Sequence, residues 1–505
     1  MIVMKFGGSS VESANAIARM VDVVQSQLSR KPVVVVSALG KTTDRLLEFA
    51  EEARLGGRYV AAKCLDELQD CHFSVAEQVA SGAALDWLER SLQRSFRDLR
   101  VILFELAEEG REFTLALQDE ISSFGERMSS EIVAAALQTA GVDSIHLDAR
   151  QLILTDPGHT HAQPLYWESY AKLRRAIVPL AGNRVVVSGG FIGSTESGVT
   201  TTLGRGGSDL TASIVGAGIS ADEIQIWTDV DGMLTADPHV LAFGYRLKAM
   251  SFEEAATMAR SGAKVLHPDT VAPAVRQRIP IVIRNSRRPE LEGTRITEVA
   301  PVCSNPVKAI ASKSDLTVLE LRPKQAADPE ALAASLSEMC ARHGVSAEFV
   351  SRSKEAIFLG VRRTARCQDL PFGLDGCVEV RLHPRAAILT LVGDGIAASP
   401  EVAARAVSAL KPIPFTLVTD VSSKIAVNLI VPNMEMERCV EILHRECFKQ
   451  VDPAVFAVTQ PETRDRKPET GNYPSGSSVS RPSNSSAWLE YRFSTRIDAP
   501  AEKPA

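Results

Sequence analysis

Apolar runs and glycine-rich breaks alternate over the first forty residues. Residues 2–6 form a short apolar run, and apolar side chains then recur at helical spacing between Val11 and Leu28. Residues 33–36 are four consecutive valines, and such a run is typical of a strand buried on both faces. The pattern predicts a strand, a helix and a second parallel strand, which is the repeating unit of an α/β domain.

A proline-free region follows. Residues 43–140 are rich in Leu, Ala, Glu and Arg, which predicts several helices with breaks near Gly57, Gly82 and Gly110. Three apolar runs come next, at residues 185–187, 224–227 and 280–283. Small or polar residues follow each run. In open α/β sheets, ligands bind at the carboxyl ends of the strands. The loops after these runs are therefore where we expect a site.

The pattern changes near residue 300. From Val307 to Val458 the chain shows two units of similar plan, each read as strand, helix, strand, strand, helix, strand. Residues 349–359 and 419–429 match at a separation of 70, each with Ser-Lys at its centre, which is a weak internal repeat. We predict an α/β domain at residues 1–295, then two α+β modules at residues 300–385 and 386–459.

The last segment, residues 460–505, has a different composition. It holds six of the 26 prolines and a serine-rich run. Such a segment buries too little apolar surface to offset the entropy of ordering, so it is predicted to be disordered.

Composition excludes several classes of protein. Hydrophobic residues make up 45% of the chain and charged residues 23%, with a formal net charge of -6, so neither a nucleic acid nor a membrane is expected as a partner. No apolar run approaches the ~18 residues of a membrane helix, and the first residues read as a strand rather than an export signal. The eight cysteines form no CxxC pair, which favours free thiols and a cytoplasmic location.

A glycine pair follows the first strand, in the segment from Lys5 to Ser10. Gly7, Gly8 and Ser9 open a helix, so their backbone amides could face an anion with Lys5 beside it. A plain turn is the alternative reading of this segment. The spacing does not match the GxxxxGK[ST] loop, which disfavours a P-loop NTPase.

Two further segments carry charge next to glycine. In the segment from Thr200 to Asp209, Arg205 offers a planar fork suited to a carboxylate, and Asp209 begins a helix. Asp209 could equally be an N-cap. Glu126 follows Ser-Ser-Phe-Gly ahead of a predicted helix, where it could bind an ammonium group or be a first-turn acid that the helix dipole favours.

Clustered aspartates follow the run at residues 224–227. A nucleotide site would suit this segment, which includes Thr228, Asp229 and Asp237, together with Lys264 further along the chain. Asp and Gly also make ordinary turns, which is the alternative. His239 and His267 lie beside prolines without metal-ligand spacing, so we interpret both as structural and predict no metal site built from protein ligands.

Taken together and in this order, the motifs resemble the amino-acid kinase family, and within it the aspartokinases. The resemblance covers residues 1 to about 295 and rests on these segments: residues 5–11, 35–38, 41–44, 125–126, 190–193, 200–209, 227–232 and 262–268. It implies an open, mostly parallel sheet with helices on both faces. The implied activity is transfer of the γ-phosphoryl group of ATP to the β-carboxylate of L-aspartate, the first step towards lysine, threonine, methionine and diaminopimelate.

The resemblance also implies roles for residues. Lys5 and Asp209 would be catalytic, and Gly7, Gly8 and Ser9 would hold phosphates. The aspartate pocket would consist of Ser37, Thr43, Glu126 and Arg205, and the contacts to ATP, with Mg²⁺ on its phosphates, would come from Thr228, Asp229, Asp237 and Lys264. Met233 and Leu234 follow Gly232, where the family usually has an aromatic residue, and His239 replaces its usual Arg.

The repeat resembles paired ACT domains, βαββαβ modules that bind regulatory amino acids. The resemblance implies interleaved modules, a homodimer or homotetramer formed through them, and an effector, lysine or threonine, near Ser346, Glu348 and Ser353. Lys354 stands where the family has an acid, which leaves the effector's identity open.

Two alternatives remain from the sequence. One is a kinase of another acid, such as glutamate or acetylglutamate, which the Trp-Thr-Asp-Val-Asp-Gly segment and the two modules disfavour. The other is an amino-acid sensor without catalysis, which the presence of Lys5, Arg205 and Asp209 disfavours.

Overall fold

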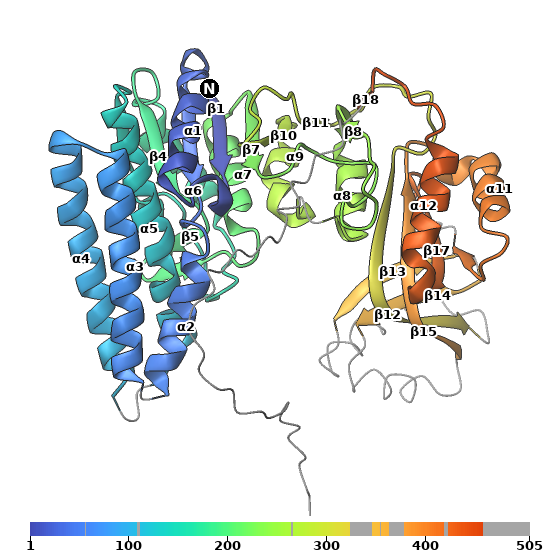
Figure 1. The fold of residues 1–505 in the computed structure, drawn as a ribbon, viewed down its shortest axis with the longest axis horizontal. Helices are drawn as coiled ribbons and strands as arrows, with labels where there is room; N and C mark the ends of the chain where they lie inside the picture. The colour runs from blue at the N-terminus through green and yellow to red at the C-terminus, as the bar shows by residue number, and fades with distance from the viewer. Residues whose placement is uncertain are drawn as a thin grey trace, which may run out of the picture. The chain divides into compact units, whose positions relative to one another are not determined.

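The computed structural model describes residues 1–55, 57–108, 112–263, 266–323, 346–353, 355–362, 378–418 and 423–457. Its largest sheet has eight strands in the order β3-β4-β2-β1-β7-β10-β11-β9 (Figure 1). Six neighbouring strands run parallel: β3 (Ser144–His146), β4 (Val185–Gly189), β2 (Pro32–Val36), β1 (Ile2–Phe6), β7 (Glu223–Thr228) and β10 (Ile281–Asn285). The antiparallel partner of β10 is β11 (Thr294–Thr297), which pairs in parallel with β9 (Ala249–Ser251). The expected mostly parallel sheet is confirmed.

Helices cover both faces of this sheet because its strands are apolar on both. In β1, Met4 and Phe6 pack into one core together with helices α1 to α5. Val3 points to the other core, together with α6, α7 and α9. Each fully buried aliphatic side chain contributes roughly 1.5–3 kcal/mol, so a continuous apolar run favours a strand sandwiched between two helical layers.

The helices lie where apolar periodicity predicts them. Those of the first half are α1 (Ala14–Gln25), α2 (Thr42–Arg54), α3 (Arg58–Val79), α4 (Gly82–Leu106), α5 (Leu115–Thr139), α6 (Tyr166–Ile177), α7 (Gly207–Ile219), α8 (Phe252–Arg260) and α9 (Ala272–Arg276). Short 3₁₀ turns are η1 (Gly8–Ser10), η2 (Leu28–Arg30), η3 (Ala149–Gln151), η4 (Pro268–Val271), η7 (Ile396–Ala398) and η8 (Asn433–Glu435). The breaks predicted near Gly57 and Gly82 are confirmed, and Gly110 lies outside the described residues.

One helix boundary was predicted wrongly. Thr114 caps α5 by accepting the Leu117 amide, so Glu126 lies in the middle of the helix and not in its first turn. Gly125 suggested a helix start, but its role is packing: a Cβ there would stand 2.8 Å from the Cβ of Ala38. The first-turn interpretation of Glu126 is therefore wrong.

The C-terminal region contains a six-stranded sheet in the order β13-β14-β12-β15-β17-β16. Its strands are β12 (Ala309–Pro323), β13 (Ala347–Arg352), β14 (Ile357–Arg362), β15 (Val378–Val392), β16 (Thr416–Val418) and β17 (Ala426–Pro432), with helices α11 (Pro400–Ala409) and α12 (Met436–Cys447). The first part of β12 pairs with the last part of β15, which in turn pairs with β17. The last part of β12 pairs with β14 and with the first part of β15. The two long strands thus run through both halves of one sheet.

A strand pairing, an ion pair and hydrogen bonds join the C-terminal region to the α/β domain. Strand β18 (Phe456–Ala457) pairs antiparallel with β8 (Arg246–Leu247). The Lys308 ammonium lies 2.8 Å from a Glu254 carboxylate oxygen, with the two side chains 2% and 1% exposed. Thr235 Oγ1 and His444 Nε2 are 2.9 Å apart. Within the part of the chain that the structure describes, no helix is long and apolar enough to cross a membrane.

Candidate active site

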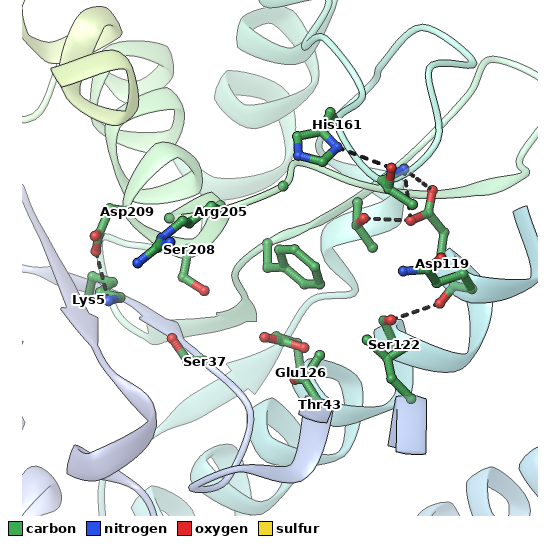
Figure 2. Close-up of a pocket in the computed structure, with 18 residues that line it drawn as sticks. Lys5, Ser37, Thr43, Asp119, Ser122, Glu126, His161, Arg205, Ser208 and Asp209 are labelled. Atoms are coloured by element: carbon green, nitrogen blue, oxygen red, sulfur yellow. Dashed lines mark hydrogen bonds and ion pairs between the residues drawn. The ribbon is translucent and has the colours of Figure 1, made fainter. Parts of the chain in front are cut away.

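A cavity of about 430 Å³ lies next to the carboxyl ends of β1, β2 and β4. Figure 2 shows Lys5 and Asp209 together at one end, and Asp119 and Ser122 at the other. Glu126 from α5 lies between them, facing His161 and Arg205 across the cavity. Segments far apart in the sequence therefore meet here, as the strand-end rule predicts.

Lys5 and Asp209 form an ion pair. Lys5 Nζ lies 2.7 Å from Asp209 Oδ1, with the side chains 11% and 16% exposed. The contact is close but not aligned as a hydrogen bond, since Asp209 Oδ1 has no hydrogen-bond partner among the described residues. Asp209 lies in the first turn of α7, and no side chain caps that helix. The N-cap interpretation of Asp209 is thus wrong, and both charges remain at the cavity.

Glu126 is a buried carboxyl group that forms no ion pair with any residue the structure describes. Its side chain lines the cavity, the residue is 4% exposed, and Oε2 has no hydrogen-bond partner among the described residues. Burial raises the pKa of Glu126 to about 8, against smaller lowering effects from backbone hydrogen bonds and from the Lys5 charge. An unpaired buried carboxylate in a cavity is suited to a cationic ligand group.

Arg205 and two hydroxyl residues complete the predicted acceptor pocket. Arg205 is exposed and makes no ion pair with any described residue. Ser37 follows β2, Thr43 lies in the first turn of α2, and both line the cavity. The structure thus brings together Ser37, Thr43, Glu126 and Arg205, although they span 168 residues of sequence.

The glycine pair forms a tight turn directly after β1. The Gly7 amide donates to the Trp227 carbonyl at 3.1 Å, and the Gly8 carbonyl accepts from the Gly40 amide at 3.2 Å. Gly8 and Ser9 begin η1. The plain-turn reading therefore accounts for the Gly7 amide, while the cavity itself is lined by Lys5 and not by these three residues.

The predicted nucleotide residues lie outside this cavity. Thr228 ends β7, and its hydroxyl donates to Asp229 at 3.2 Å. Asp237 accepts the His239 amide at 2.8 Å and so closes a turn. None of these three lines the cavity, and Lys264 lies outside the described residues.

Two of the three predicted effector residues, Glu348 and Ser353, have partners within the chain. The Glu348 carboxylate lies 3.0 Å from both Lys313 and Arg362. The Ser353 hydroxyl accepts the Ala356 amide at 3.0 Å, which closes the turn between β13 and β14. Ser346 is exposed just before β13, and Lys354 lies outside the described residues.

Other residues of the cavity were missed by sequence reasoning. They include Asp119 and His161, while Phe191 and Ser208 lie in segments that carried the resemblance but were given no role in the site. Asp119 precedes Glu126 by seven residues, about two helical turns, so the two share a helix face, and this spacing could have indicated it. His161 comes from a loop whose position depends on distant contacts, so the sequence offered no signal for it.

The chain matches known families along most of its length. Residues 1–285 match the model of the amino acid kinase family, and residues 389–447 match an ACT domain model. The fold and the site thus define an amino acid kinase with a C-terminal ACT region.

Proteins of similar sequence show which family of amino acid kinases the chain belongs to. The chain is 31% identical to aspartokinase 1, chloroplastic, of Arabidopsis thaliana, over 89% of this chain and 80% of the relative. It is 30% identical to lysine-sensitive aspartokinase 3 of Escherichia coli, over 89% and 99%. The chain belongs to the aspartokinases, ATP-dependent kinases that act on aspartate, and the function expected from its motifs is confirmed.

Solved structures agree with this assignment. Escherichia coli aspartokinase III in complex with aspartate and ADP, in its R state, matches with a TM-score of 0.74 and 29% identity, covering 89% of this chain and 100% of that one. The same enzyme in complex with lysine and aspartate, in its T state, matches with a TM-score of 0.72 over 89% and 99%.

Proposed function

We propose that the cavity binds L-aspartate, with its ammonium on Glu126 and its α-carboxylate on Arg205. The observation that carries this proposal is that a buried carboxyl group, whose Oε2 has no hydrogen-bond partner among the described residues, faces the Arg205 guanidinium across one cavity. Ser37 and Thr43 offer hydroxyl groups to the substrate. The β-carboxylate then points towards Lys5 and Asp209.

In this proposal the chain contributes position and charge rather than proton transfer. The nucleophile is already a carboxylate, so no general base is required. Lys5 neutralises charge on the phosphoryl group as it moves, and Asp209 holds the Lys5 ammonium in place at 2.7 Å. Positioning and preorganised charge account for most of the acceleration in phosphoryl transfer.

We propose ATP as the donor, with its phosphates near Gly7, Gly8 and Ser9 and contacts from Thr228, Asp229, Asp237 and Lys264. The described residues contain no cluster of three or more His, Cys, Asp or Glu that could hold a metal ion. Mg²⁺ therefore fits best as an ion carried by the nucleotide phosphates, which is its usual mode of binding, with Asp209 as the carboxylate beside the point of transfer. Bound in this way it would supply charge neutralisation on those phosphates.

Regulation and assembly form the finer part of the proposal. We divide the chain into a catalytic domain at residues 1–295 and two interleaved ACT modules, a division that the shared strands β12 and β15 support. The edge strand β13, with Val350 51% exposed, offers pairing to a second copy in a homodimer or homotetramer. Lysine or threonine is the effector to test at Ser346, Glu348 and Ser353. Free thiols in the described residues fit a cytoplasmic location.

The experiment is phosphoryl transfer from Mg-ATP to L-aspartate, with the acyl phosphate trapped by hydroxylamine. Product from aspartate but not from glutamate supports the proposal, and lysine and threonine added in turn identify the effector. Lys5→Ala should lower kcat about a hundredfold or more, as loss of one preorganised charge does, while Lys172→Ala on the exposed face of α6 serves as the control. A folded Lys5→Ala protein with most of its activity would refute the role of Lys5.

A further inference from the structure

Asp119 is a buried acid that the proposed chemistry does not use. It is 1% exposed, lies on α5 about two turns before Glu126, and lines the same cavity. A buried carboxylate is expensive to keep unless hydrogen bonds satisfy it, so its contacts indicate what it does.

Those contacts join three separate segments. Asp119 Oδ1 accepts the Thr202 hydroxyl at 2.5 Å, from strand β6 (Thr200–Thr202), which pairs with β5 (Ile192–Ser194). The Thr160 amide donates to both carboxylate oxygens, at 3.1 and 3.0 Å. His159 Nδ1 lies 2.8 Å from Oδ2. Asp119 therefore ties α5, the loop containing Thr160 and strand β6 to one another.

The loop is held in a conformation that its sequence does not favour. Thr160 has φ 67°, in the left-handed region that β-branched residues rarely adopt. The forked hydrogen bond from its amide to Asp119 stabilises this conformation. The next residue, His161, is thereby placed along the wall of the cavity.

The same loop packs closely against Gly204, the residue before Arg205. A Cβ on Gly204 would stand 2.8 Å from His161 Cδ2 and 3.1 Å from the Thr160 carbonyl oxygen. The loop and the backbone one residue before Arg205 are thus in tight contact. A shift of Thr160 would therefore displace the backbone next to Arg205, while Glu126 would stay on the helix that carries Asp119.

We propose that Asp119 is a positioning residue for the acceptor substrate. By holding the loop at Thr160, Asp119 fixes the distance between the Glu126 carboxylate and the Arg205 guanidinium. This inference rests on the proposed function of that cavity. Asp119 touches neither nucleotide nor phosphoryl group in this arrangement, so its loss should weaken aspartate binding selectively.

The test is steady-state kinetics of Asp119→Asn with each substrate varied in turn. Because small misplacements of binding groups have large effects, we expect KM for aspartate to rise on the order of tenfold to a hundredfold, with KM for Mg-ATP within about twofold. The matched control is Glu120→Gln, the next residue on α5, whose carboxylate pairs with Arg127 and Arg150. It should leave both KM values unchanged.

Two further variants extend the test, and the first of them keeps it decisive if Asp119→Asn does not fold. Thr202→Val removes one donor from the clamp and should raise KM for aspartate in the same direction by a smaller factor. Thr160→Gly, which relaxes the left-handed conformation, should restore part of the lost affinity in the Asp119→Asn background. An unchanged KM for aspartate in a folded variant, or an equal rise in both KM values, overturns the proposal.

The outcome is separable from that of the proposed function. If the wild-type protein phosphorylates a different amino acid, the proposed substrate is wrong, and the variants are then compared with the wild type on that acceptor. A selective rise in acceptor KM still supports the clamp, and equal KM values for wild type and variants still overturn it.

Discussion

Replacing Glu126 by Gln tests the electrostatics of the acceptor pocket most directly. Burial moves the pKa of Glu126 from 4.5 to about 8, which corresponds to roughly 5 kcal/mol of preference for the neutral form at about 1.36 kcal/mol per pKa unit. A substrate ammonium binds well only to the ionised carboxylate. Wild-type kcat/KM for aspartate should therefore rise with pH between about 6 and 8 and level off above the free-enzyme pKa.

In the Glu126→Gln variant this pH dependence should disappear. The neutral amide cannot ionise, and the loss of a charge-assisted hydrogen bond, about 1.5–3 kcal/mol, should lower kcat/KM at pH 8.5 by roughly tenfold to a hundredfold. The assay is hydroxylamine trapping across this pH range at saturating Mg-ATP. A variant that still shows an ionisation near pH 8 in kcat/KM would refute the assignment of that pKa to Glu126.

The same change should stabilise the protein without substrate at high pH. The folded-state pKa of Glu126 lies above its unfolded value, so the stability contribution is full below pH 4.5 and is lost as pH rises towards 8. At pH 8.5 Glu126→Gln should unfold at higher denaturant than wild type, and at pH 4 the two should match. Glu131→Gln is the matched control, because burial also raises the pKa of Glu131 on α5 outside the cavity. It should share the stability effect and leave kcat/KM unchanged.

Two further predictions concern stability. Lys308→Met should lower the free energy of unfolding, measured in urea, by about 3–5 kcal/mol, since it leaves the Glu254 carboxylate buried without its partner. Adding Glu254→Gln, which keeps the cap at Ser251, should recover part of this loss. No recovery in the double variant would contradict the reasoning. His72 is 1% exposed and burial lowers its pKa to about 4, so stability should fall as pH drops from 6.5 towards 4. In urea at pH 5, the free energy of unfolding of His72→Leu should exceed that of the wild type by about 2 kcal/mol, with no comparable gain at pH 8. An equal difference at the two pH values would count against the shifted pKa.

The sequence predicted most of the fold because its signals were local. Four consecutive valines predicted the buried strand β2, and apolar residues at helical spacing predicted α1 and the helical region from α2 to α5. The strand-end rule then predicted a site next to Lys5, since parallel strands present their carboxyl ends at one edge. Arg205 and Asp209 follow β6, which pairs antiparallel with β5 outside the large sheet.

What the sequence missed depends on contacts between distant residues. Gly125 looked like a helix boundary, and only its packing against Ala38 explains a glycine in mid-helix. Asp119 meets Thr202 across 83 residues, which no periodicity reveals. The pairing of β12 with both halves of β15 likewise depends on register over long separations. The roles of Thr228, Asp229, Asp237 and Lys264 in nucleotide binding stay predictions.

The pairing of β18 with β8 has a mechanical consequence. The C-terminal region leaves the α/β domain through the segment before β12 and returns to it at Phe456. This second attachment adds to the Lys308–Glu254 ion pair and the Thr235–His444 contact. Together these contacts restrict rotation of the sheet that contains β12 and β15 relative to β8, more than a single linker would. A chain cut short before residue 456 would lose this second attachment and leave β8 with an unpaired edge.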